Sequence, residues 1–196
     1  NTDTSLNRLL YETILSRVNI ANINSFYETI THRVPLAALS ETWFLENLKE
    51  TRKNVYDKIK LATDFVLAIL MLTGFLILLP VLSIIIYIGD RGPIFYRQTR
   101  VGRDGKIFTI WKFRTMKVGA ENNGPQFAAV GDSRVTTVGK ILRLSRLDEL
   151  PQAINILKNE MSFIGPRPER PEFVAELQKL MPYYNARHLI KPGLTG

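Results

Sequence analysis

The stretch RLSRLDELPQAINILKNEMSFIGPRP, residues 143–168, is the part around which the other segments can be understood, because two adjacent acids lie in it among basic residues. Pro151 lacks an N–H group and is tolerated in the first turn of a helix but not deep inside one. A helix through AINILKN is therefore expected to begin between Leu147 and Leu150.

The acids of this stretch, Asp148 and Glu149, are the candidates for chemistry. Asp148 would lie at or next to the helix start, where unpaired backbone N–H groups and the positive end of the helix dipole suit a phosphate and keep a carboxylate ionised. The same pattern also fits an ordinary N-cap at Asp148 followed by a first-turn acid. The rest of the sequence has to decide between these two interpretations.

The composition distinguishes an uncharged apolar run from the polar segments on either side of it. Of its 196 residues, those from Phe65 to Ile88 carry no charge, whereas the segments on either side are mixed and polar. The formal net charge of +8 limits the partners to anionic ones, namely nucleic acid, acidic lipid or phosphorylated substrates. The absence of cysteine fits a reducing compartment.

The run from Phe65 to Ile88 is predicted to enter a membrane. Its 24 positions, at about 1.5 Å each, would cross a hydrocarbon core of roughly 30 Å as one straight helix. Pro80 interrupts the run. If this proline only kinks the helix, the run crosses; if it bends the chain back, the run is a hairpin that enters and leaves by one face. Basic residues on both flanks favour the hairpin. A buried helix of a soluble core is the remaining alternative.

Beyond the apolar run, the pattern changes to short β-type segments. IFYRQT and IFTIWKFRTM flank the turn-forming pair Asp104-Gly105, which predicts a β-hairpin. Residues 91–117 hold eight basic side chains and one acid, a cluster that fits a solvated face, acidic head groups or a pyrophosphate. Residues 118–131 are expected to form a flexible loop. Residues 132–146 are expected to form a basic amphipathic helix on a membrane surface.

The segment after the two acids ends in a turn fixed by Pro166 and Pro168, with Arg167 at its apex. Such a turn suits a phosphate-binding guanidinium, but it is also an ordinary loop. A helix is expected at residues 172–180, and three basic or titratable residues follow close together, namely Arg187, His188 and Lys191.

The first fifty residues carry no motif for chemistry. Apolar spacing predicts a helix at residues 5–17, followed by a short strand at 18–23. A second helix is expected through FYETITHR, and a third within residues 35–50.

Four longer motifs occur in order: DKIKLATD before the apolar run, GPIFYRQTRVGRDGKIFTIWKFRTM, RLDELPQAINILKNEMSFIGPRPERPEF and RHLIKPGLTG. Together they resemble the bacterial sugar transferase family, the monotopic phosphoglycosyl transferases that act on polyprenyl phosphate. The resemblance covers Val55 to Gly196. Upstream, FYETITHRVP and ETWF resemble the end of the N-terminal region of the larger members, which transfer hexose 1-phosphates for exopolysaccharide, capsule or O-antigen.

Two positions depart from the family pattern. Leu61 stands where a basic residue usually follows Lys60, and Leu79-Pro80 stands where the small members have Ser-Pro. The family sequence usually continues beyond PGLTG, so we expect a C-terminal tail that is missing here.

The resemblance implies a two-step reaction with a covalent intermediate. An Asp carboxylate attacks the sugar-bearing phosphate of a UDP-sugar and releases UMP, and the sugar phosphate then passes to undecaprenyl phosphate. Asp148 matches the nucleophile, and Glu149 matches the ligand of Mg²⁺, which would neutralise pyrophosphate charge. With a metal on Glu149, no raised pKa has to be assumed for either acid. The expected substrate-binding residues are Lys112, Arg143, Arg167, Arg187 and Lys191.

The expected fold class is α/β and helix-rich, with a re-entrant membrane helix hairpin at residues 61–89, amphipathic surface helices and a small β-hairpin that carries an active site on the cytoplasmic face. Residues 1–54 would be the end of an accessory region and linker, and residues 55–196 the catalytic domain. The partners would be a UDP-sugar, undecaprenyl phosphate and the bacterial inner membrane; a homodimer is left open and no nucleic acid is expected. A non-catalytic basic membrane scaffold is the competing interpretation.

Overall fold

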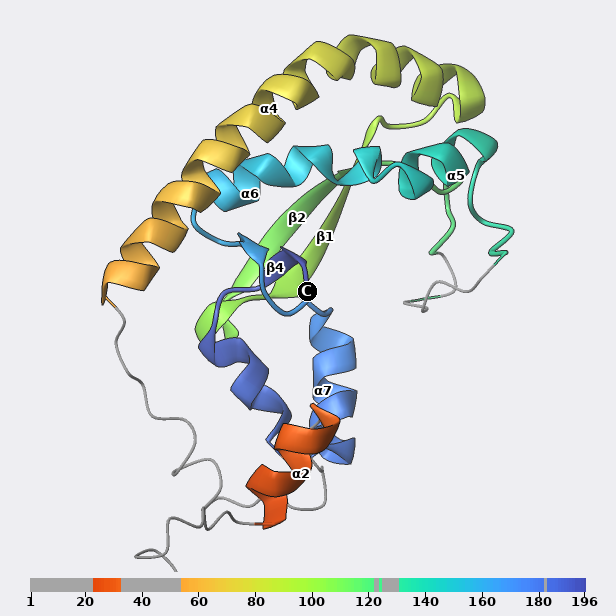
Figure 1. Cartoon of the computed structure of the whole chain (residues 1–196). Coiled ribbons are helices and arrows are strands. Elements are labelled where there is room, and N and C mark those ends of the chain that lie inside the picture. Colours follow the sequence, from red (N-terminus) through yellow and green to blue (C-terminus); the bar gives the residue numbers. More distant parts are fainter. Residues whose placement is uncertain (1–22, 33–53, 122–123, 125–130, 182) are drawn as a thin grey trace, which may run out of the picture. The chain divides into compact units, whose positions relative to one another are not determined.

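The computed structural model describes residues 23–32, 54–121, 124, 131–181 and 183–196 (Figure 1). The chain divides into two compact units, residues 1–53 and 54–196. In the first unit, the helix expected through FYETITHR is confirmed as α2 (Ile23–Thr31). The other elements expected before residue 54 lie outside the described residues. The assignment of an accessory region and a catalytic domain stays a prediction.

The second unit is helix-rich and contains two small sheets, which is compatible with the expected α/β class. Strands β1 and β2 pair antiparallel, and β3 and β4 pair in parallel. In chain order, the elements are α4 (Asn54–Asp90), β1 (Phe95–Val101), the 3₁₀ turn η2 (Arg103–Gly105), β2 (Ile107–Phe113), α5 (Thr137–Leu144), the 3₁₀ helix η3 (Leu147–Gln152), α6 (Ala153–Leu157), β3 (Ser162–Ile164), α7 (Pro171–Leu180), the 3₁₀ helix η4 (Tyr184–Leu189) and β4 (Gly193–Thr195).

The predicted β-hairpin is confirmed in β1 and β2, with Tyr96 opposite Lys112. At the turn between the strands, Asp104 and Gly105 have φ values of 56° and 73°, so both lie in the left-handed region. Two consecutive left-handed residues match the twist of the strands that they join, and Asp-Gly adopts this conformation at little cost. The local sequence therefore determines the register that places Lys112 on the ribbon.

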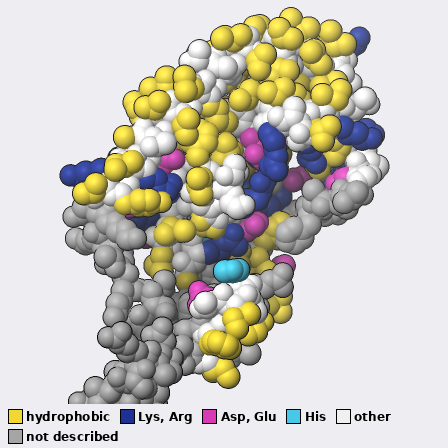
Figure 2. Space-filling model, viewed as in Figure 1, with side chains coloured by type: hydrophobic (Ala, Val, Ile, Leu, Met, Phe, Trp, Pro, Cys, Tyr) yellow, Lys and Arg dark blue, Asp and Glu magenta, His cyan; other side chains and the backbone are white. Residues whose placement is uncertain are grey.

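Helix α4 is one continuous helix of 37 residues, with Pro80 inside it. The hairpin expected at residues 61–89 is not shown, since no turn separates two helices there. Pro80 cannot donate to the carbonyl of Leu76, which opens the helix on one side and allows the bend seen in Figure 1. Among the described residues, α4 is the one helix long and apolar enough to cross a membrane. Figure 2 shows its apolar side chains spread over the surface of the molecule.

Both ends of α4 are tied to the following part of the chain by polar contacts. Near its start, Asp64 accepts a hydrogen bond of 3.1 Å from the backbone N–H of Phe163, and Lys60 donates to the hydroxyl of Ser162. At its end, the carboxylate of Asp90 pairs with Arg114 at 3.0 Å. Asp64 is buried, so its hydrogen bonds compensate for the loss of water.

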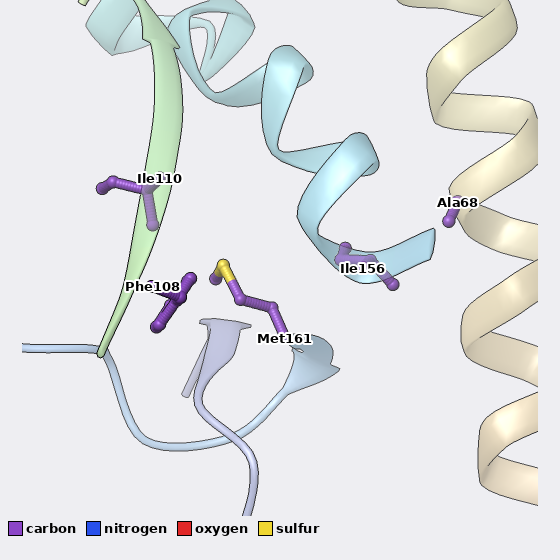
Figure 3. Close-up of a cluster of buried hydrophobic side chains, with 5 residues drawn as sticks. All are labelled: Ala68, Phe108, Ile110, Ile156 and Met161. Atoms are coloured by element: carbon purple, nitrogen blue, oxygen red, sulfur yellow. The ribbon is translucent and has the colours of Figure 1, made fainter. Parts of the chain in front are cut away.

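The apolar core lies between α4 and the elements beneath it, in two clusters. Figure 3 shows the first, in which Phe108 and Ile110 of β2, Ile156 of α6 and Met161 face Ala68 of α4. The second joins α4 to β2 and α5 through Phe75, Leu82, Ile86, Phe113 and Leu142. Because α4 contributes to both clusters, its first half packs along α6 and its second half reaches α5.

The basic helix expected at residues 132–146 is shorter than predicted and begins at Thr137. The reason is local: Asp132 pairs with Arg134 in a turn at 2.6 Å, and the hydroxyl of Thr136 caps the helix by accepting from Gly139 N. The amphipathic character is confirmed, since Ile141 and Leu144 are exposed on α5. The helix expected at 172–180 is confirmed as α7, with Pro171 in its first turn.

We predict that Gly139→Ala lowers the melting temperature of the detergent-solubilised protein. A Cβ at Gly139 would overlap the backbone carbonyl of Thr115, which cannot move without displacing the end of β2. An overpacked contact of this kind costs about 1–3 kcal/mol. Gly74→Ala in α4 is the matched control, because its Cβ meets nothing within 4 Å. Equal melting temperatures for the two variants would show that α5 does not pack against Thr115.

Candidate active site

The two acids lie in η3, directly after a sharp reversal of the chain. Arg146 has φ 60° and ψ 13°, a left-handed conformation that ends the preceding segment and starts η3 at Leu147. The start predicted from Pro151 is therefore confirmed. The helix differs in kind, since residues 147–152 form a 3₁₀ helix and the α-helix begins at Ala153. A 3₁₀ turn has three residues per turn, so consecutive acids point to different sides.

The carboxylate of Glu149 is buried and surrounded by cations. Its Oε1 accepts from Lys112 Nζ at 2.7 Å and from Arg167 at 3.2 Å. Arg146 lies 3.6 Å from its Oε2. Burial alone would raise the pKa of Glu149, but the ion pairs with Lys112 and Arg167 outweigh it and hold that pKa below its usual value. Glu149 is therefore a paired, ionised carboxylate.

Asp148 is buried to the same degree as Glu149, but its carboxylate lacks such ion pairs. Its Oδ1 has no hydrogen-bond partner, and no cation of the described residues lies within ion-pair distance of the carboxylate. Burial raises the pKa of Asp148, against the opposing field of Lys112. The sequence does not reveal how deeply η3 is buried, and this burial raises the pKa of Asp148. The expectation that no raised pKa has to be assumed supposes a metal on Glu149 and stays a prediction.

Lys112 and Arg143 are brought to the acid pair from different elements. Lys112 extends from β2, where burial lowers its pKa and the ion pair with Glu149 partly restores it. Arg143, at the end of α5, donates from Nε to the hydroxyl of Thr115 at 2.8 Å. Its positive charge acts on Asp148 by lowering that pKa. Figure 2 shows Lys and Arg side chains gathered with acids below the apolar surface of α4.

The two remaining expected residues do not reach the acids. Arg187 donates from its guanidinium to the backbone carbonyl of Arg167 at 2.8 Å and stacks on Tyr184. Lys191 donates to the side chain of Asn159, and burial lowers its pKa, with smaller contributions from charges that include Asp64 and Lys60 of α4. The structure thus brings together Lys112, Arg143 and Arg167 with the acids, and places Arg187 behind Arg167 and Lys191 near the start of α4.

Three residues near the acids were not singled out from the sequence. Arg146 precedes Glu149 by three residues, and this helical spacing could have identified it. Thr115 holds Arg143, but no sequence pattern links positions so far apart. Gln152 is 3% exposed and its Nε2 has no partner. No sequence pattern could have singled out Gln152, because its interest depends on the burial of its side-chain amide, which only the structure shows.

The donor set fits a magnesium ion in its chemistry. Mg²⁺ prefers carboxylate oxygens and usually takes only one or two from the protein, with water and phosphate completing its shell. Asp148 and Glu149 supply two adjacent carboxylates, and the buried Oδ1 of Asp148 is an acceptor without a partner. No group of three or more acidic or histidine side chains suitable for a metal occurs among the residues that the structure describes.

We predict that neutralising the two acids affects the free energy of unfolding differently. Glu149→Gln should lower the free energy of unfolding by about 3 kcal/mol, because it leaves the buried ammonium of Lys112 without its partner. Asp148→Asn should leave stability unchanged or raise it, because it removes a buried charge that no ion pair compensates. Denaturant titration in detergent measures both. An equal loss in the two variants would mean that Asp148 is also paired.

Proteins of known function were found that are similar to this chain over the residues that form the site. The family described as bacterial sugar transferase matches residues 55–196. A UDP-N-acetylgalactosamine-undecaprenyl-phosphate N-acetylgalactosaminephosphotransferase of Aeromonas hydrophila is 38% identical over 189 residues, which are 96% of this chain and 44% of that protein. A UDP-glucose:undecaprenyl-phosphate glucose-1-phosphate transferase of Escherichia coli K12 is 45% identical over 141 residues, covering 70% of this chain and 30% of that protein.

A further relative of the same printed name, from Caulobacter vibrioides, is 42% identical over 139 residues, which are 70% of this chain and 51% of that protein. The chain thus spans about half or less of the length of these three relatives. The match over residues 55–196 includes both acids and the four basic residues beside them, Lys112, Arg143, Arg146 and Arg167. The chain belongs to the bacterial sugar transferase family.

Proposed function

We propose that this chain contains the catalytic part of a phosphoglycosyl transferase that moves a hexose or N-acetylhexosamine 1-phosphate from a UDP-sugar to undecaprenyl phosphate. The printed names of the relatives supply the donor and acceptor classes, and they differ in the sugar. The observation that carries the proposal is the unequal pairing of two adjacent buried acids. Glu149 is held by three cations, whereas Asp148 has a carboxylate oxygen without a partner.

This difference supports distinct roles for the two acids. A nucleophile needs a carboxylate that ion pairs do not occupy, and Asp148 meets this condition. The cations around Glu149 can shift onto phosphate oxygens when a donor enters, because guanidinium and ammonium groups bind phosphate as readily as carboxylate. Lys112, Arg143 and Arg167 would then screen the approach of the Asp148 carboxylate to an anionic phosphate.

In the first step, an oxygen of Asp148 attacks the phosphorus that bears the sugar. A bond from this oxygen to phosphorus forms, the phosphoanhydride bond breaks, and UMP leaves with the bridging oxygen. In the second step, an oxygen of undecaprenyl phosphate attacks the same phosphorus and releases the carboxylate of Asp148. Mg²⁺ held by Glu149 would supply neutralisation of the pyrophosphate charge when bound.

We also propose that α4 is re-entrant and that the catalytic part lies on the cytoplasmic face. A helix of 37 residues measures about 55 Å, which exceeds a hydrocarbon core of roughly 30 Å. Asp64 near its start and Asp90 at its end both bond to the segment that follows. A helix that crossed the membrane would separate these two ends. The bend at Pro80 and the basic residues on both flanks support entry and return by one face.

The covalent intermediate predicts release of UMP without any acceptor. Incubation with a UDP-sugar alone, tested over UDP-glucose, UDP-galactose and their N-acetylated forms, should yield UMP equal in amount to the enzyme. Intact-protein mass should rise by one sugar phosphate, and Asp148→Asn should show neither change. UMP that appears only after undecaprenyl phosphate is added, with no adduct, would contradict the two-step route. A scaffold without activity would keep its function after Asp148→Ala.

The re-entrant path predicts that both flanks of the apolar run, Phe65 to Ile88, are shielded from outside the cell. Since the sequence has no cysteine, single cysteines at Lys58 and Lys117 can be labelled with an impermeant thiol reagent. Neither should react in intact cells, and both should react after permeabilisation. Labelling of one of the two in intact cells would show that α4 crosses the membrane.

A further inference from the structure

The turn that carries Arg167 is held through four consecutive backbone carbonyls. Gly193 N donates to the carbonyl of Pro166 at 3.0 Å, and Arg187 donates to that of Arg167 at 2.8 Å. Arg100 donates to the carbonyl of Pro168 at 2.9 Å, and Val101 N donates to that of Glu169, also at 2.9 Å. All four donors come from outside the turn, two from the end of β1 and two from the segment after α7.

The turn needs these donors because it has few of its own. Proline has no N–H, so Pro166 and Pro168 cannot form the ladder or helix bonds that normally fix a segment. Gly165 and Gly193 touch backbone to backbone, and a Cβ on either would overlap the other segment. The position of Arg167 therefore depends on groups supplied from elsewhere.

Two of the four donors are guanidinium groups whose other contacts hold them in place. Arg100 also donates to Gln98 and lies 3.7 Å from Glu169. Arg187 also donates to the hydroxyl of Tyr184 and stacks on its ring, 4.9 Å from the centroid. Each guanidinium is thus directed at the turn by a neighbour on its own segment. Guanidinium groups in this arrangement are engaged with protein oxygens.

We propose that Arg187 and Arg100 are positioning residues that hold the guanidinium of Arg167 against the acid pair. This rests on the proposed function and goes beyond it, since it assigns to Arg187 a task other than binding substrate phosphate. We call the bonds from Arg187 and Arg100 to the carbonyls of Arg167 and Pro168 the clamp. The clamp acts through the backbone of the turn and keeps the Arg167 side chain at 3.2 Å from Glu149. In the reaction, this placement puts a cation where the pyrophosphate charge develops, without a search for the correct geometry.

The clamp differs from a phosphate contact in what it requires of residue 187. A carbonyl accepts a hydrogen bond from a neutral donor, so Arg187→Gln should retain part of the function. A phosphate contact depends on positive charge, so Arg187→Gln should be as poor as Arg187→Met. The clamp also acts only through Arg167. The loss from Arg187→Met should therefore vanish when the Arg167 side chain is already absent.

The experiment measures the first half-reaction, as the rate of UMP release from the UDP-sugar that the wild-type protein uses. Arg187→Met should lower this rate by roughly tenfold, as expected for one lost hydrogen bond to a site group. Arg187→Gln should lie between Arg187→Met and wild type. In an Arg167→Ala background, Arg187→Met should change the rate by less than about twofold. The matched control is Arg97→Met, whose guanidinium stacks on Trp111 at 3.8 Å but does not contact the turn.

A second measurement does not depend on activity. Hydrogen exchange of the backbone amides within residues 163–170 should become faster in Arg187→Met and in Arg100→Met, and should not change in Arg97→Met. If the wild-type protein releases no UMP but exchange responds as expected, the proposed function fails and the clamp stands. Three results would each overturn the clamp. Arg187→Met could lower the rate of UMP release by the same factor in the Arg167→Ala background as in wild type, Arg187→Gln and Arg187→Met could be equally active, or hydrogen exchange could be unchanged in Arg187→Met.

Discussion

The site depends on one constraint, namely that the buried carboxylate of Glu149 needs cations beside it. Glu149 is 6% exposed, and an unpaired charge at that depth would be expelled or neutralised. Its partners come from three places: Lys112 from the β-ribbon, Arg146 from the chain reversal before η3, and Arg167 from the turn after β3. The ribbon, η3 and the turn therefore have to converge at one point. Asp148 shares the burial without the partners, which leaves it available for chemistry.

Helix α4 bears on where that point lies. Under the proposed function, the acceptor would be confined to the bilayer and the nucleotide sugar dissolved in water, so the site that joins them would lie at the boundary. The bond from Phe163 N–H to Asp64 attaches β3 to the start of α4, and the pair of Arg114 with Asp90 attaches β2 to its end. These contacts fix the height of the acids relative to the apolar surface. The polar side chain of Asp64, at the start of an apolar run, is thus explained by its hydrogen bond to β3.

The features that the sequence predicted correctly are governed by local rules. Pro151 restricts where a helix can start, and Asp104-Gly105 restricts the turn between two strands; neither depends on distant residues. The sequence left open whether Pro80 kinks the helix or turns the chain back. Helix α4 continues through Pro80, because one missing hydrogen bond can be absorbed as a bend when the turns before and after the proline are packed.

The contacts of the basic residues could be predicted only in part. Positions of Lys112, Arg143 and Arg167 beside the acids follow from the family resemblance, and their geometry agrees with it. Arg187 and Lys191 are close in sequence, yet one contacts the turn at Arg167 and the other contacts Asn159. Two side chains on an irregular segment can point in opposite directions, and no periodicity reports which way each points.

The parallel pairing of β3 with β4 also has a consequence for how the protein is made. Ser162 pairs with Gly193 and Ile164 with Thr195, so the turn between them and α7 is closed by residues about thirty positions further along the chain. Helix α4 leaves the ribosome more than a hundred residues earlier than these partners of β3. The turn that carries Arg167 can therefore be closed only after residues 193–195 have emerged, long after α4 has been synthesised.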